Sequence, residues 1–258
     1  MTKQEDRIQR VMTILRQEGS AAVQDLARRI GVSHMTIRRD LTVLEAKGTV
    51  RLFYGSVALE KKGTDGEPLY RLDKAEEENR ELKERIADYC AKMIRDGDVL
   101  YFDAGTTTEM IVSRLPSDVH ITVVCSSINT LNMVAPMKNV RVIITGGVYH
   151  ETSGVFESAE GIDLLKKTRT NLAFISAGGI RADLGVTCSN LFEVPLKQVA
   201  LESSLKSVLV ADSSKFGRIN SVFFAEASDF DIIVTDNELP EEIEQEFTER
   251  DIHITRVS

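Results

Sequence analysis

Cysteine is scarce in this chain of 258 residues, and its three cysteines, Cys90, Cys125 and Cys188, lie far apart. None belongs to a C-x-x-C pair or lies near a histidine at the spacing of metal ligands. Disulfide-rich folds and zinc domains depend on such spacings. The sequence therefore predicts neither a disulfide framework nor a metal site, and we expect reduced, mostly buried thiols.

Long apolar runs are absent too, since no stretch approaches the roughly 18 apolar residues that a membrane helix needs. The opening segment MTKQEDRIQR lacks the apolar core of a signal peptide. Hydrophobic residues make up 42% and charged residues 28% of the chain, which is ordinary for a globular protein. We therefore expect a cytoplasmic protein without a membrane partner.

The net charge of −8 is unevenly distributed along the chain. Residues 1–62 hold 12 Lys and Arg against seven Asp and Glu, which gives +5, and the remaining 196 residues hold 20 against 33, which gives −13. A basic head attracts phosphates, while an acidic body resists nonspecific adhesion. This distribution favours nucleic-acid binding by the N-terminal part.

The segment 23–44 has the pattern of two helices joined by a tight turn. Apolar residues recur with a helical period over 23–30, and Gly31 permits the turn. Ser33 is placed to cap a second helix, whose outer face carries Thr, Arg and His side chains. A short helix with such a face is what reading the major groove of DNA requires. Its expected buried face is formed by Ile37, Leu41 and Leu44.

Two short strands, 50–54 and 56–59, are predicted on either side of Gly55 and would form a wing. A further helix, over 5–17, is predicted before the two-helix segment. The sequence thus predicts a winged helix-turn-helix domain over residues 1–59. A polar stretch with Gly and Pro, 60–74, reads as a linker, and residues 75–258 form the second predicted domain.

Residues 32–44, VSHMTIRRDLTVL, resemble the signature of the DeoR family of bacterial transcription repressors. The start of the second helix is expected to meet base edges, Arg38 and Arg39 to contact phosphates or guanines, and Arg51 of the wing to contact a phosphate. The complete set of expected DNA contacts is Ser33, His34, Met35, Thr36, Arg38, Arg39 and Arg51.

Beyond residue 75, short apolar strands alternate with helices, after a charged helix at about 75–95. Such alternation is typical of a parallel sheet covered on both faces, a Rossmann-like α/β domain. The predicted strands are 99–102, 120–125, 140–144, 172–176, 207–211, 232–235 and 253–256. The predicted helices are 107–115, 129–133, 161–167 and 193–202.

The loop 103–108, DAGTTT, follows the first of these strands and opens a helix, where open α/β sheets bind ligands. Gly105 would let the backbone approach a ligand, and three threonine hydroxyls with helix N-terminal N–H groups suit a phosphate. The loop is neither a P-loop nor a G-x-G-x-x-G fingerprint. The alternative is that its threonines only cap the helix.

Polar residues also end the other strands. Glu193 and Lys197, four apart on a helix, are either an ordinary ion pair or a pair that flanks a sugar phosphate. His150 could reach a ligand, although an ordinary surface histidine is the more frequent case. The strand ends contribute Ser126, Asn129, Gly146 and Gly147 to the candidate site.

This second part also resembles the sensor domain of the DeoR family, with DAGTTT, TGG, SAGGI and DSSKFG in the family's order. The resemblance implies a fold similar to ribose-phosphate isomerase and a phosphorylated sugar as effector. The pocket candidates it implies are Asp103, Gly105, Thr106, Thr107, Thr108, Gly178, Glu193, Lys197, Asp212 and Lys215.

The sequence thus predicts a DNA-binding regulator, more often a repressor in this family, of a carbohydrate-metabolism operon. Its expected partners are double-stranded operator DNA and a sugar phosphate, with no cofactor, and it is expected to be a homodimer or homotetramer. A rival prediction is a sugar-phosphate isomerase-like enzyme with an accessory head, but an isomerase has no need of a DNA-reading helix. A purely architectural DNA binder would leave the strand-end loops and the acidic body unexplained.

Overall fold

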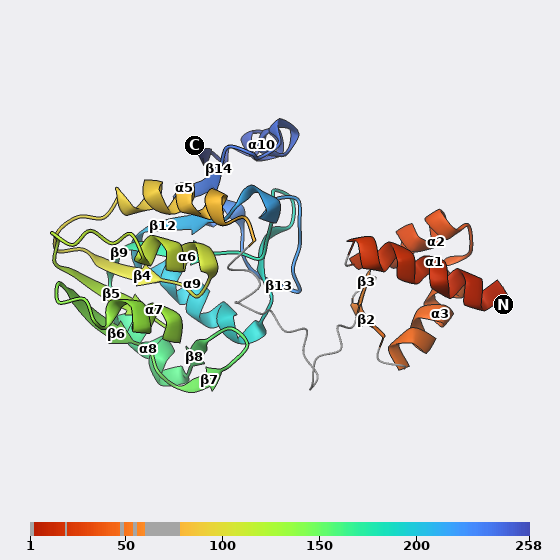
Figure 1. The fold of residues 1–258 in the computed structure, drawn as a ribbon, viewed down its shortest axis with the longest axis horizontal. Helices are drawn as coiled ribbons and strands as arrows, with labels where there is room; N and C mark the ends of the chain where they lie inside the picture. The colour runs from red at the N-terminus through yellow and green to blue at the C-terminus, as the bar shows by residue number, and fades with distance from the viewer. Residues whose placement is uncertain (1–2, 19, 47–48, 54–55, 60–77) are drawn as a thin grey trace. The chain divides into compact units, whose positions relative to one another are not determined.

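The computed structural model of the chain describes residues 3–18, 20–46, 49–53, 56–59 and 78–258. Two compact units, Met1–Leu69 and Tyr70–Ser258, divide the chain and are described one at a time (Figure 1). The first contains α1 (Lys3–Glu18), β1 (Ser20–Ala22), α2 (Val23–Ile30), α3 (His34–Ala46), β2 (Val50–Phe53) and β3 (Ser56–Leu59).

The helices of the first unit confirm the predicted helix-turn-helix. Gly31 follows α2 with a φ of 78°, a left-handed conformation that glycine adopts without steric cost. The hydroxyl of Ser33 accepts a hydrogen bond from the backbone N–H of Thr36 at 3.2 Å and so caps α3. The predicted inner face of α3 is buried in one core with α1 and α2, through Ile37, Leu41 and Leu44.

The wing is an antiparallel hairpin of β2 and β3 in which Phe53 lies opposite Ser56. The prediction extended the first strand to Tyr54 and placed Gly55 at the turn, and both residues lie outside the described part of the chain. β1 was not predicted, because three residues are too few to show a period. It pairs with β3, so the sheet has the order β1-β3-β2.

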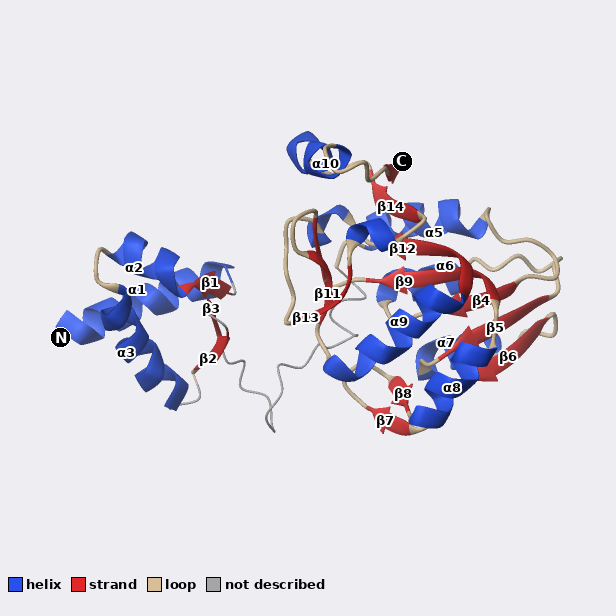
Figure 2. Cartoon of the chain, turned by 180° about the vertical axis from the view of Figure 1, so that it is seen from behind, coloured by secondary structure: helices blue, strands red, loops and turns tan. Residues whose placement is uncertain are grey.

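A seven-stranded parallel sheet forms the centre of the second unit, as predicted (Figure 2). Its order is β15-β14-β12-β9-β4-β5-β6, and every neighbouring pair is parallel. The strands are β4 (Val99–Phe102), β5 (Ile121–Cys125), β6 (Val140–Ile144), β9 (Thr170–Ser176), β12 (Ser204–Val210), β14 (Ile232–Asp236) and β15 (Ile254–Val257).

Helices cover both faces of this sheet. One apolar core joins it to α5 (Arg80–Ala91), α6 (Thr106–Val112) and α7 (Ile128–Val134). The other joins it to α8 (Ala159–Lys167), α9 (Val194–Ser203) and α10 (Glu241–Thr248), and Figures 1 and 2 show α5–α7 and α8–α9 on opposite faces. The helix predicted at about 75–95 corresponds to the shorter α5, and residues 75–77 lie outside the described part of the chain. The helix α10 was not predicted.

The strand order reverses between β4 and β9. The chain builds β4, β5 and β6 toward one edge, then returns to the centre and builds β9, β12, β14 and β15 toward the other. In open α/β sheets this reversal leaves a crevice at the carboxyl ends of the two central strands, where ligands bind. Here Asp103 directly follows β4, and Ser176 is the last residue of β9.

The remaining short elements of the second unit were not predicted. They comprise the hairpin of β7 (Val148–His150) and β8 (Val155–Glu157) and an antiparallel sheet of β10 (Gly179–Arg181), β11 (Gly185–Cys188) and β13 (Val222–Ala225). Three single-turn helices, η1 (Leu191–Glu193), η2 (Ser213–Lys215) and η3 (Ala227–Asp229), complete the described elements.

The three cysteines are buried and free, as predicted. Burial raises the pKa of Cys90 and of Cys125 to about 12 and that of Cys188 to about 11. The thiols therefore stay protonated at neutral pH. None of the helices in the described ranges is long and apolar enough to cross a membrane.

Candidate functional site

The outer face of α3 presents the residues expected to read DNA. His34, Met35, Arg38 and Arg39 are exposed, with Met35 at 59%. Within the described residues, neither arginine has an ion-pair partner, so both guanidinium groups can reach an anion. This helix therefore offers two cations and an uncommitted apolar side chain on one face.

The hydroxyl groups of Ser33 and Thr36 already form hydrogen bonds at the start of α3. Their hydroxyls lie 2.8 Å apart, and the Ser33 hydroxyl also accepts from the Thr36 backbone N–H. These two hydroxyls thus fix the beginning of α3 and orient its first turn. Arg51 lies on β2, and its side chain falls outside the described part of the structure.

Asp40, within the TIRRDL segment, holds α3 in place and was not assigned a role from the sequence. It is buried and accepts hydrogen bonds from the Arg7 guanidinium and, at 3.0 Å, from the side-chain amide of Gln4. An acidic residue inside an otherwise apolar face was the available signal, since buried carboxylates require partners. The α1–α3 contact therefore contains a charged pair.

Asp103, Ser176 and Lys197 meet at the reversal between β4 and β9. The backbone N–H and the hydroxyl of Ser176 lie 3.0 and 2.8 Å from Asp103 Oδ2. Lys197 of α9, only 1% exposed, donates to the same Oδ2 and, at 3.1 Å, to the carbonyl oxygen of Ser176. The cluster joins residues up to 94 positions apart in the chain.

Glu193 extends this buried cluster. Its Oε2 lies 3.8 Å from Lys197 Nζ, and its Oε1 accepts from the Asn190 amide at 2.6 Å. Burial raises the pKa of Glu193. Burial also lowers the pKa of Lys197, but the carboxylates of Asp103 and Glu193 outweigh that effect and raise it well above its ordinary value. Lys197 is thus a committed cation whose first partner is Asp103.

The threonines of the loop 103–108 are buried but have different partners. The Thr108 hydroxyl lies 2.7 Å from the carbonyl oxygens of Asp103 and Gly105 and fixes the loop. Among the described residues, the hydroxyls of Thr106 and Thr107 form no hydrogen bond, although the residues are only 5% and 6% exposed. Side-chain capping of α6 is not observed, so these two hydroxyls are available to a ligand.

Gly105 has a steric reason to be glycine that differs from the expected ligand approach. A Cβ at this position would lie 2.7 Å from the Ser176 hydroxyl oxygen. The contact closes the loop against the end of β9. Gly178 is constrained similarly, because a Cβ there would lie 2.2 Å from the side-chain nitrogen of Asn220. Both glycines therefore permit close packing of the strand-end loops.

Residues after β5 and β6 lie at the same edge of the sheet. Ser126 is buried with its hydroxyl 3.5 Å from that of Tyr101, and the Asn129 amide donates to Glu109 of α6 at 3.0 Å. Gly146 and Gly147 lead into β7 with positive φ values of 67° and 119°. They position the β7–β8 hairpin, which was not predicted.

The hairpin packs against the loop 103–108 and the start of α9. Val155 forms a small apolar cluster with Ala104 and Leu196. The ring of His150 stacks on Phe192, with 3.6 Å between the ring centroids and 6° between their planes. His150 is thus a half-buried packing residue, and its Nε2 lies 3.7 Å from Glu157 Oε2.

Asp212 and Lys215 lie in the loop after β12. Asp212 is fully buried, and its Oδ1 accepts from the side-chain amide of Asn79 at 2.9 Å. Lys215 of η2 is half-buried and has no ion-pair partner among the residues that the structure describes. This lysine supplies an uncommitted positive charge, whereas Lys197 does not.

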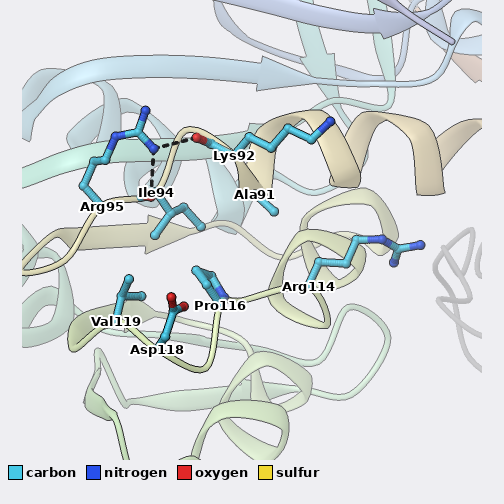
Figure 3. A pocket seen from close by; sticks show the side chains of 8 residues that line it. All are labelled: Ala91, Lys92, Ile94, Arg95, Arg114, Pro116, Asp118 and Val119. Atoms are coloured by element: carbon cyan, nitrogen blue, oxygen red, sulfur yellow. Dashed lines mark hydrogen bonds between the residues drawn. The ribbon is translucent and has the colours of Figure 1, made fainter.

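A shallow pocket of about 390 Å³ lies on the side of the sheet opposite the carboxyl ends of its strands (Figure 3). Its lining residues precede β4 and β5 and so belong to the amino ends of the strands. The side chain of Arg95 turns back to the Lys92 and Ile94 carbonyl oxygens. This pocket is therefore separate from the cluster at the carboxyl ends.

Comparison with protein families identifies both units. A model of the DeoR C terminal sensor domain matches residues 78–237, more than half of the chain, and a model of the DeoR-like helix-turn-helix domain matches residues 7–62. The chain belongs to the DeoR family of transcriptional regulators. The DeoR sensor match contains the whole Asp103 cluster, and the DeoR helix-turn-helix match contains α2, α3 and the wing.

Curated DeoR-type relatives match over nearly the full chain. The deoxyribose operon repressor of Escherichia coli (strain K12) is 33% identical over 91% of both chains. The HTH-type transcriptional regulator IolR of Bacillus subtilis (strain 168) is 30% identical over 96% of this chain and 97% of its own. The glycerol-3-phosphate regulon repressor of Escherichia coli (strain K12) is 28% identical over 98% of both. The chain is therefore a DNA-binding transcriptional regulator and not an isomerase-like enzyme.

Solved structures similar to this DeoR-family chain are more distant. Ribose 5-phosphate isomerase A from Methanocaldococcus jannaschii is 14% identical with a TM-score of 0.41, over 54% of this chain and 55% of that one. The eIF2B delta subunit from Chaetomium thermophilum is 12% identical with a TM-score of 0.45, over 61% and 56%. Similarity at this level identifies no residue of the site.

Proposed function

We propose that this regulator represses a carbohydrate-metabolism operon and that a phosphorylated sugar, bound at the carboxyl ends of β4 and β9, modulates its affinity for DNA. The observation that carries the proposal is the Asp103–Ser176–Lys197 cluster at the reversal of strand order. Ligands of open α/β sheets bind at that position. The names of two relatives, a deoxyribose operon repressor and a glycerol-3-phosphate regulon repressor, support this ligand class.

Within this site we assign different roles to the residues predicted from the sequence. Thr106 and Thr107, with hydroxyls that have no partner among the described residues, are proposed to donate to phosphate oxygens, and Lys215 supplies the positive charge. Lys197 already faces two carboxylates, so we assign it to holding Asp103 in place. The remaining proposed members of the site are Gly105, Thr108, Ser126, Asn129, Gly146, Gly147, Gly178, Glu193 and Asp212.

For the DNA-binding unit we propose that α3 lies in the major groove. His34 and Met35 would meet base edges, and Arg38 and Arg39 would contact guanines or phosphates. Ser33 and Thr36 set the start of the helix, and Arg51 of the wing would contact a phosphate. Two such units in a homodimer or homotetramer would bind two half-sites.

We propose that residues 1–59 bind DNA, that residues 60–74 connect the two domains, and that residues 75–258 bind the effector. Since a ligand acts only through its different affinity for two states, a sugar phosphate that releases DNA must favour a state with weaker DNA binding. The test is fluorescence anisotropy of the full chain on its own promoter DNA at fixed salt. The titrants are 2-deoxyribose 5-phosphate, glycerol 3-phosphate and their unphosphorylated parents.

Release by one phosphorylated compound and not by its parent is the expected result. Tight DNA binding that no compound changes would contradict the sugar-phosphate proposal while leaving DNA binding intact. Release by the unphosphorylated parent at the same concentration would contradict the proposed contacts of Thr106 and Thr107 with phosphate.

A further inference from the structure

Asn79, at the entry to α5, has an unusual backbone conformation. Its φ is 55°, in the left-handed region that non-glycine residues rarely adopt and that asparagine tolerates better than most. Its side chain does not cap α5. Instead its Nδ2 donates to Asp212 Oδ1 at 2.9 Å and lies 3.1 Å from the Ser214 hydroxyl oxygen, contacts that span more than 130 residues of sequence.

The loop that receives these hydrogen bonds lies at the ligand edge of the sheet. Asp212 follows β12 and is fully buried. Its Oδ1 also accepts from the backbone N–H and the hydroxyl of Ser214, whereas Oδ2 has no partner within the described part of the chain. A buried carboxylate depends strongly on each of its donors. The position of this loop is therefore tied to Asn79.

Two further contacts strengthen the connection between α5 and the ligand edge. Arg85 donates to the side-chain oxygen of Asn237, in the loop after β14, at 2.9 Å. The backbone N–H of Ser213 donates to Asp236 at 2.7 Å and joins the loop after β12 to the end of β14. The first turns of α5 are thus hydrogen-bonded to the strand-end loops at two places.

The start of α5 is also where the chain arrives from the DNA-binding unit, since only residues 60–77 separate β3 from the turn that contains Asn79. We propose that Asn79 is a positioning residue that couples the loop 212–215 to this point of arrival, so that a change in either is felt by the other. The proposal rests on the proposed function in one respect, that the effector is what changes the loop.

Coupling between two sites is reciprocal, so binding of DNA must also alter the loop 212–215. The experiment therefore needs no sugar. Amide hydrogen exchange of the full chain is measured with and without its own operator DNA, at the backbone N–H groups of Ser213, Ser214 and Lys215 and at that of Lys83, which donates to the Asn79 carbonyl oxygen at 3.1 Å. Operator DNA is expected to change exchange in both segments.

Two variants separate coupling from simple support. Asn79→Gly keeps access to the left-handed backbone but lacks the amide, so DNA should still change exchange at Lys83 and no longer at 213–215. Arg80→Ala is the matched control, because the side chain of this exposed neighbour forms, among the described residues, only a surface ion pair with Glu84.

An unchanged loop 212–215 in the wild-type chain on DNA binding would overturn the proposal. So would a wild-type response in Asn79→Gly at an unchanged melting temperature. If no sugar phosphate released DNA but this pattern held, the proposed effector would be wrong and the coupling through Asn79 would stand.

Discussion

Replacing Lys197 by methionine tests the buried cluster most severely. Methionine keeps most of the volume of the lysine stem, so little cavity is created. The substitution removes the cation that faces Asp103 Oδ2 and lies 3.8 Å from Glu193 Oε2. The side chain of Asp103 is only 4% exposed and that of Glu193 12%, so water cannot replace the ammonium group.

The expected cost is large because one partner of a buried pair is left behind. Such changes cost about 3–5 kcal/mol, compared with about 5–15 kcal/mol for the whole stability of a typical domain. Asp103 keeps the two Ser176 donors in the variant, which favours the lower half of that range. We expect the free energy of unfolding of the second unit to fall by about 3–4 kcal/mol.

Urea unfolding of the full chain, followed by circular dichroism, measures this loss. The matched control is Lys166→Met on α8, whose ammonium group pairs with Asp163 at 3.9 Å while 57% exposed. Surface pairs of this kind contribute about 0–1 kcal/mol. A loss in Lys197→Met no larger than that of the control would refute the assignment of Lys197 as the central cation.

The pH dependence gives a second check. Burial raises the pKa of Glu193, and without the Lys197 cation nothing of comparable strength opposes this, so the folded-state pKa of Glu193 exceeds the unfolded one by more than in the wild type. The folded variant then binds more protons than the unfolded chain, and its stability falls as pH rises. The difference between variant and wild type should therefore grow from pH 5 to pH 8, and a constant difference would contradict this reasoning.

Three further predictions concern single contacts. Thr107→Val should remove the effector response and leave stability nearly unchanged, since the Thr107 hydroxyl has no partner among the described residues; normal induction of this variant would contradict the site. Thr108→Val should lower the free energy of unfolding by about 1–3 kcal/mol in a thermal melt, because two carbonyl oxygens lose their donor. Arg38→Ala should weaken operator binding by about 1–3 kcal/mol or lower the salt dependence of binding, measured by anisotropy against Arg80→Ala as control, and unchanged affinity would contradict major-groove docking by α3. Asp40→Asn should destabilise the first unit by about 2 kcal/mol in urea, since it replaces the carboxylate that pairs with α1.

Sequence pattern predicted the elements that are long or apolar enough to carry a period. The strands β4 and β6 were predicted with the correct ends, and β4, which lies inside the sheet, reads as the continuous apolar run that burial on both faces produces. The helix-turn-helix was predicted from the spacing of Ile37, Leu41 and Leu44, which the structure buries. The strands β1, β7, β8, β10 and β11 have only three or four residues and show no period.

The candidate site was predicted in its members but not in its partnerships. The spacing of Glu193 and Lys197 suggested a local pair, whereas the first partner of Lys197 is Asp103, 94 residues away. Ser176 was not predicted as a member of the site, although it makes two contacts with Asp103. Such contacts depend on the order of strands in the sheet, which one sequence does not encode locally.

The position of the effector is the claim on which the account depends most. Amide hydrogen exchange of the full chain, with and without the sugar phosphate that releases it from promoter DNA, measures that position directly. The account predicts slower exchange in the loops 103–108 and 176–178, at the carboxyl ends of β4 and β9. Slower exchange at 91–95 and 114–119 instead, around the pocket at the opposite edge of the sheet, would contradict it.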